Sequence, residues 1–72
     1  MRLVLELLIY LGEPRKESVE IERGMRVAEV LRRASVDLAE VGMVIWEGKV
    51  LSLEDEAPEF GSLRVIPQLG GG

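Results

Sequence analysis

The sequence predicts an α+β fold in which a mixed sheet of four or five strands carries one α-helix on one face. Short stretches alternate apolar and polar residues, which is typical of strands, and one later stretch repeats its apolar residues at helical spacing. That single amphipathic helix is the only predicted element able to cover the apolar face of the sheet. The chain has 72 residues, which suffices for one small domain.

Two strands joined by a turn are expected at the start of the chain. The first spans residues 2–10, and the second spans residues 17–22, where Val19 and Ile21 face inward. The alternating inward residues of the first strand are Leu3, Leu5, Leu7 and Ile9. Gly12 favours a turn between them, because glycine allows turn dihedrals. The two runs therefore predict a β-hairpin.

A helix is expected from Arg26 onward. Its apolar residues fall at positions i, i+3, i+4 and i+7 of one stripe, namely Val27, Val30, Leu31 and Ala34. Leu38 extends the stripe by one more turn, and Gly42 closes the region. Glu29 lies in the first turn, where a negative charge suits the helix dipole. No Ser, Thr, Asp or Asn stands directly before the first apolar residue, so the N-terminal cap is expected to be poor.

Three more strands complete the pattern. Residues 43–46 form the third strand, residues 50–51 follow a Glu47-Gly48 turn as a short fourth, and residues 63–66 form the last, which Pro67 ends. A right-handed crossover through the helix lets the first and last strands lie side by side in the centre, which is the β-grasp arrangement. We expect a β-grasp domain over residues 1–67 and a flexible glycine-rich tail over residues 68–72.

Composition excludes several classes of function. The chain contains no cysteine and no histidine, which rules out disulfides, cysteine-ligated zinc and a Ser-His-Asp triad, so we expect no enzyme and no bound cofactor. The net charge of -4 argues against nucleic-acid binding. No apolar run is long enough to span a membrane and no signal peptide is evident, so the cytoplasm is the expected compartment. The absence of Asn and Thr, with Arg favoured over Lys, is a thermophile-like bias.

A cluster of acidic residues follows the fourth strand. It consists of Glu54, Asp55, Glu56 and Glu59. We interpret it as a solvated loop and predict no metal site, because the spacing of an EF-hand is absent. The loop could alternatively meet a basic surface on a partner.

The most distinctive chemical feature is the glycine run Gly70, Gly71 and Gly72 directly after the last strand. Glycine has no Cβ, so such a segment can pass through a narrow channel and present its carboxylate to another protein. Six residues from Pro67 onward span about 20 Å when extended. A carboxylate is a poor electrophile and needs activation, for which we expect an acyl-adenylate. The alternative is an end of the chain without function.

Two segments resemble ubiquitin-like β-grasp proteins that end in Gly-Gly. Residues 44–51 resemble the Leu-Ile-Phe-Ala-Gly-Lys-x-Leu stretch of ubiquitin. Residues 65–72 resemble the ends of the molybdopterin-synthase small subunit and of archaeal small modifiers. The chain departs from the usual pattern by a third glycine and by the absence of arginines just before the glycines.

The resemblance implies that an E1-like enzyme adenylates Gly72 with ATP and magnesium. The adenylate would then either form an isopeptide bond with a lysine of a target protein or accept sulfur from a persulfide to give a thiocarboxylate. Implied partners are the E1-like enzyme and, depending on the route, an E2-like enzyme, a sulfurtransferase and a deconjugating protease. The resemblance to archaeal small modifiers also implies that one protein can serve both routes. Lys49 and Lys16 would be acceptors for self-conjugation.

Strand alternation predicts a second site on the sheet face that the helix leaves open. Leu8, Ile45 and Ile66 point to that face and are expected to form an exposed apolar patch, with Ile45 at the position that resembles ubiquitin's central isoleucine. The alternatives are scattered surface residues or a self-association contact. Trp46 is expected in the core. A binding module that uses the sheet face, with no role for the tail, is the alternative to the modifier.

Overall fold

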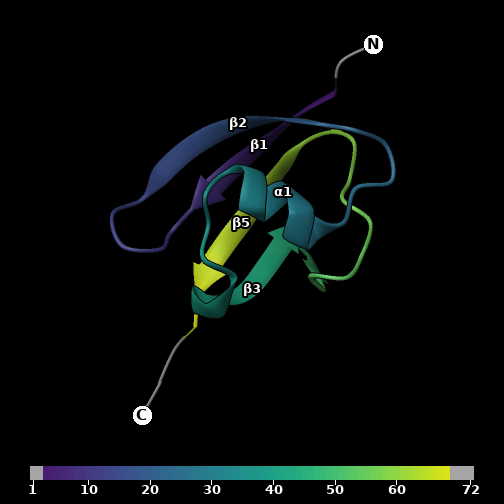
Figure 1. Cartoon of the computed structure of the whole chain (residues 1–72). Coiled ribbons are helices and arrows are strands. Elements are labelled where there is room, and N and C mark those ends of the chain that lie inside the picture. Colours follow the sequence, from purple (N-terminus) through teal and green to yellow (C-terminus); the bar gives the residue numbers. More distant parts are fainter. Residues whose placement is uncertain (1–2, 69–72) are drawn as a thin grey trace.

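The computed structural model describes residues 3–68. Five strands, one α-helix and one 3₁₀ helix follow each other along this part of the chain (Figure 1). Their bounds are β1 (Leu3–Ile9), β2 (Arg15–Ile21), α1 (Val27–Arg33), η1 (Leu38–Glu40), β3 (Val41–Trp46), β4 (Lys49–Leu51) and β5 (Ser62–Pro67). The predicted strand-strand-helix-strand-strand-strand order is confirmed.

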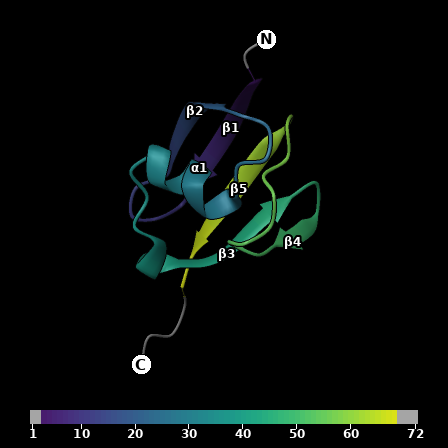
Figure 2. The ribbon, with the colours of Figure 1, turned by 45° about the vertical axis from the view of Figure 1, so that its right-hand side comes forward.

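The five strands form one mixed sheet in the order β2-β1-β5-β3-β4. β1 and β5 are parallel neighbours near the centre, whereas the β1–β2, β3–β5 and β3–β4 pairs are antiparallel. α1 lies across one face of this sheet (Figures 1 and 2). The predicted α+β class and the β-grasp-like arrangement, with first and last strands side by side, are therefore confirmed.

The core lies between α1 and the sheet. Leu5, Leu7 and Ile9 of β1 are fully covered, and they meet Leu63 and Val65 of the parallel strand β5. The other buried residues lie on β2, α1 and β3 and in the segments directly before and after α1. They are Val19, Ile21, Met25, Val27, Val30, Leu31, Ala34, Val36 and Val44. The strand alternation thus predicted the inward face correctly. Leu3 lies at the margin and is half-buried.

The helix is shorter than the apolar stripe predicted. α1 ends at Arg33, because Ser35 adopts a positive φ of 60°, a left-handed conformation that a helix cannot continue through. Leu38 therefore does not belong to α1. It reaches the core from η1, whose start is capped by Asp37, where the carboxylate accepts a hydrogen bond of 3.0 Å from the backbone N–H of Ala39.

A loop caps the start of α1 in place of a capping side chain. The backbone N–H groups of Val27 and Ala28 donate to the carbonyls of Asp55 and Leu53, at 2.9 and 3.0 Å. Glu29 reaches back to accept from the backbone N–H of Arg26 at 3.0 Å. The predicted absence of a side-chain cap is confirmed, and the loop carbonyls satisfy donors that the helix itself leaves unpaired.

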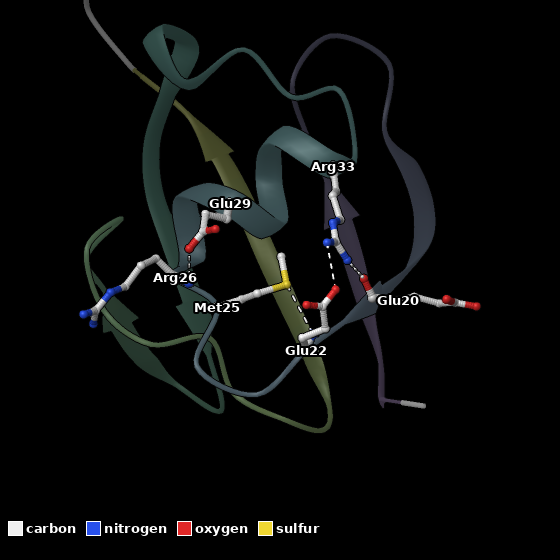
Figure 3. A network of polar contacts seen from close by, with 6 residues as sticks. All are labelled: Glu20, Glu22, Met25, Arg26, Glu29 and Arg33. Carbon is white, nitrogen blue, oxygen red and sulfur yellow. Dashed lines mark hydrogen bonds and ion pairs between the residues drawn. The ribbon is translucent and has the colours of Figure 1, made fainter. Parts of the chain in front are cut away.

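Hydrogen bonds connect α1 to the outer strand β2 and the residue that follows it (Figure 3). The guanidinium of Arg33 donates to the carbonyl of Glu20 at 2.9 Å and to the carboxylate of Glu22 at 3.0 Å. The backbone N–H of Glu22 in turn contacts the sulfur of Met25 at 3.2 Å. Arg15 on β2 donates to the carbonyl of Ala34 at 3.3 Å just beyond the last turn. The contacts of Arg33 are exposed and those of Arg15 and Met25 are partly buried, and together they join the helix region to the edge strand at two places.

β3 begins at Val41, two residues before its predicted start. Gly42 therefore lies inside this strand and does not close the helical region, and the pairing of β3 with β5 shifts register between Val41 and Met43. Pro67 is the last residue of β5 and lies opposite Val41. A proline is tolerated at this end because it need not donate to a further ladder bond.

Trp46 lies at the other end of β3. It points to the helix side opposite Leu63, but it is half-buried at the margin of the core, so the predicted core position is only partly correct. Its indole N–H donates to the carbonyl of Phe60 at 2.9 Å, and the two rings meet edge to face with centroids 5.4 Å apart. The polar edge of the indole explains this marginal position, because it needs a hydrogen-bond partner.

Candidate functional site

The sheet face opposite α1 gathers the three residues predicted to form a patch. Leu8, Ile45 and Ile66 are all half-buried and come from the central strands β1, β3 and β5. Their strands are paired so that Leu8 lies opposite Arg64 and Arg64 lies opposite Ile45. The patch residues therefore surround an exposed arginine at the centre of the face.

Further apolar side chains extend this surface. Met43 lies opposite Ile66 and is 43 % exposed, and Val50 of the edge strand β4 lies opposite Ile45 and is 65 % exposed. One row across all five strands therefore reads Lys16, Leu8, Arg64, Ile45 and Val50. We name this row together with Met43 and Ile66 the open-face surface. It combines apolar area with two cations.

Arg64 was missing from the predicted patch, although its outward direction followed from the alternation. Within residues 3–68 no carboxylate lies within ion-pair distance of its guanidinium. Glu6, on the same face, contacts the hydroxyl of Ser62, which donates to its carboxylate at 3.4 Å. Arg64 is exposed, has no carboxylate partner among residues 3–68 and is set among apolar side chains, which suits a partner surface that carries a carboxylate.

A shallow hollow of about 350 Å³ adjoins this row. It is lined by Leu8, Ile45, Glu47, Gly48, Gly61, Ser62 and Arg64. Its lining offers apolar side chains together with the carboxylate of Glu47, the hydroxyl of Ser62 and the guanidinium of Arg64.

The predicted acidic cluster disperses in the structure. Asp55 accepts from the backbone N–H of Ser52 at 2.8 Å, and Glu59 pairs with Arg23 at 3.3 Å. Glu56 bridges to Arg26 through the backbone. In the described part of the chain, no three carboxylates gather as a metal site would require.

The described chain leaves the sheet beside the apolar end of the open face. Ile66 is two residues before Gln68, the last described residue, whose backbone N–H donates to the carbonyl of Glu40 at 2.9 Å. Gln68 is also the first residue of the predicted tail. The predicted attachment residues Gly70, Gly71 and Gly72 lie outside the described residues, as does the rest of that tail.

Both lysines are exposed, at separate places. Lys16 lies on β2 opposite Leu8, at the edge of the open face. Lys49 begins β4 directly after the predicted Glu47-Gly48 turn, where Glu47 and Gly48 both have positive φ values. Their amines are accessible to chemistry from outside, and their role as acceptors stays a prediction.

Comparison with models of known families gives no match, and comparison with curated proteins gives no significant relative. Neither helical segment within residues 3–68 is long and apolar enough to cross a membrane. The likeness to ubiquitin-like proteins accordingly rests on the β-grasp-like fold and on the two short segments 44–51 and 65–72.

Proposed function

We propose that the chain is a ubiquitin-like protein modifier, activated at Gly72 by an E1-like enzyme. The observation that carries this proposal is the junction between β5 and the open face. β5 lies between β1 and β3, and the chain leaves it at Gln68, next to Ile66 and Met43. A partner docked on the open-face surface would therefore stand beside the point from which the glycine-rich end departs.

The proposed chemistry belongs to the partner enzymes. The Gly72 carboxylate attacks the α-phosphate of ATP and displaces pyrophosphate, which gives an acyl-adenylate. A lysine amine of a target protein then displaces AMP to form an isopeptide bond. In the sulfur route, the terminal sulfur of a persulfide on a partner enzyme displaces AMP instead and forms an acyl disulfide. A second thiol of that enzyme then reduces the S–S bond, which releases the thiocarboxylate and leaves a disulfide on the enzyme. ATP and magnesium are held by the activating enzyme. This chain contributes the docking surface and the carboxylate.

The test is mass spectrometry of the protein isolated from its native cells. A C-terminus with one oxygen exchanged for sulfur would establish the carrier route, and a tail remnant on lysines of other proteins would establish conjugation. Gly72→Leu, expressed in the same cells, is the matched control and should abolish both products while the melting temperature stays unchanged. An unmodified carboxylate in every condition would contradict the proposal.

A second candidate is a binding module that uses only the open-face surface. The row Leu8, Arg64 and Ile45, with its hollow of about 350 Å³, favours it. An apolar partner segment that carries one carboxylate would complement this row. Removal of Gly71 and Gly72 discriminates the two candidates, because a module keeps its partner and its cellular function whereas a modifier loses the latter.

A further inference from the structure

Gly42 is in close contact with the last described residues of the chain. A Cβ at this position would lie 2.7 Å from the Cα of Gln68 and 2.7 Å from the carbonyl oxygen of Pro67. Both neighbours are backbone atoms, so they cannot rotate away as a flexible side chain would. The φ of Gly42 is not in the left-handed region, so space and not conformation requires glycine here.

Two backbone contacts hold the same segment against the end of η1 and the start of β3. Pro67 is paired with Val41, and the N–H of Gln68 donates to the carbonyl of Glu40 at 2.9 Å. The register shift between Val41 and Met43 places the missing side chain of Gly42 under this segment. Glu40, Val41 and Gly42 therefore form a seat, which we call the exit seat, for Pro67 and Gln68.

We propose that Gly42 is a positioning residue that sets where the C-terminal segment leaves the fold. This inference rests on the proposed function and deepens it. Four residues follow Gln68 in the sequence, and four residues span at most about 14 Å when fully extended. The activating partner must then take the Gly72 carboxylate within about 14 Å of Gln68, which is less than the reach of about 20 Å expected from Pro67 onward.

The exit seat should also affect how often the Gly72 carboxylate reaches the active site of the activating enzyme. A fixed starting point confines the volume that a tethered group can sample, which raises its effective concentration at a site within reach. Docking through the open-face surface does not involve Gly42. Loss of the exit seat should therefore lower the rate of activation of the docked protein while its docking affinity stays unchanged.

Amide hydrogen exchange measured by NMR tests the exit seat directly. In the unchanged protein, the Gln68 N–H should exchange at least tenfold more slowly than in an unstructured chain. Gly42→Ala should remove that protection, while the N–H of Tyr10, which donates to the carbonyl of Val65 at 2.9 Å at the same end of the sheet, keeps its own. Equal Gln68 protection in both proteins would overturn the inference.

A matched control separates the exit seat from general loss of stability. Gly24→Ala places a Cβ in open space at a φ of +88°, so it strains the backbone without touching the exit seat. It should leave Gln68 protected. Gln68→Pro removes the donor N–H together with the glutamine side chain. Because it leaves no amide proton at position 68, it serves only in the activation assay below if Gly42→Ala fails to fold. Loss of Gln68 protection in Gly24→Ala would show that the protection reports global stability, which contradicts a local seat.

The functional readout is exchange between ATP and labelled pyrophosphate, catalysed by the fraction of the native cell extract that activates the unchanged protein. Gly42→Ala and Gln68→Pro should lower kcat severalfold with KM unchanged, whereas Gly24→Ala should change neither. Unchanged kcat for both exit variants would overturn the positioning role. If no fraction activates the unchanged protein, the proposed function fails, and amide exchange alone still decides whether the exit seat holds Gln68.

Discussion

Leu7 and Leu8 are neighbours on β1 with the same side chain in opposite surroundings. Leu7 is 0 % exposed beneath α1, and Leu8 is half-buried on the open face beside Arg64. The pair separates the two roles of the sheet, because one side chain belongs to the core and the other to the proposed docking surface. A substitution of each by alanine removes the same atoms.

Leu7→Ala should lower the free energy of unfolding by about 2–5 kcal/mol, since it leaves a cavity in a small core. Leu8→Ala should lower it by about 1 kcal/mol or less, because that side chain is already partly in water. Urea unfolding followed by the fluorescence of Trp46, the sole tryptophan, measures both. Equal losses in the two variants would contradict the assignment of the faces.

At the scale of elements, the loop after β4 organises the start of α1. The hydroxyl of Ser52 accepts from the N–H of Glu54 at 3.2 Å, and the carboxylate of Asp55 accepts from the N–H of Ser52 at 2.8 Å. The bond from Ser52 to Asp55 is one half of a capping box, and the hydroxyl of Ser52 binds Glu54 in place of Asp55. The turn presents the carbonyls of Leu53 and Asp55 to Ala28 and Val27.

Asp55→Ala should therefore destabilise α1, although Asp55 lies outside the helix. We expect a loss of about 1 kcal/mol in the free energy of unfolding, because one hydrogen bond of the turn is removed. Amide exchange of Val27 and Ala28 should accelerate at the same time. Asp55→Asn keeps an oxygen acceptor and should behave nearly as the unchanged protein. If exchange of the two helix amides stays the same in Asp55→Ala, the turn does not support α1.

Taken as a whole, the molecule shows which features local patterns can predict. The period of two in strands fixes which residues face inward, so the inward residues and the sheet followed from the sequence. The predicted end of α1 was wrong. Leu38 continues the helical spacing in the sequence, but the positive φ of Ser35 ends the helix before it. The Asp before Leu38 is the residue that could have indicated a second helical start.

The features of the candidate site that were missed depend on pairing between distant strands. Arg64 lies at the centre of the open-face surface because β5 pairs it with Leu8 on one side and Ile45 on the other. No local sequence pattern specifies this pairing. The exit seat arises because Gly42 meets Pro67 and Gln68 across the β3–β5 pair. Alternation predicts the side of a sheet to which a residue points, but not its neighbours on the adjoining strands.

The division into a folded domain and a tail can be tested on the whole molecule. The buried apolar residues lie between Leu5 and Val65, and the contacts of the exit seat end at Gln68. A chain that ends at Gln68 should therefore melt within about 4 °C of the full chain, which corresponds to about 0.5 kcal/mol in a domain of this size. Under the proposed function, it should lose conjugation and sulfur transfer completely.

A chain that ends at Ile66 is the matched comparison for this truncation. It lacks the pairing of Pro67 with Val41 and the hydrogen bond from Gln68 to Glu40, so it should melt at a lower temperature than the chain that ends at Gln68. Differential scanning calorimetry of the three chains gives the comparison. If removal of residues 69–72 lowered the melting temperature as much as removal of residues 67–72, the tail would support the fold. Its proposed freedom to enter a partner's active site would then be wrong.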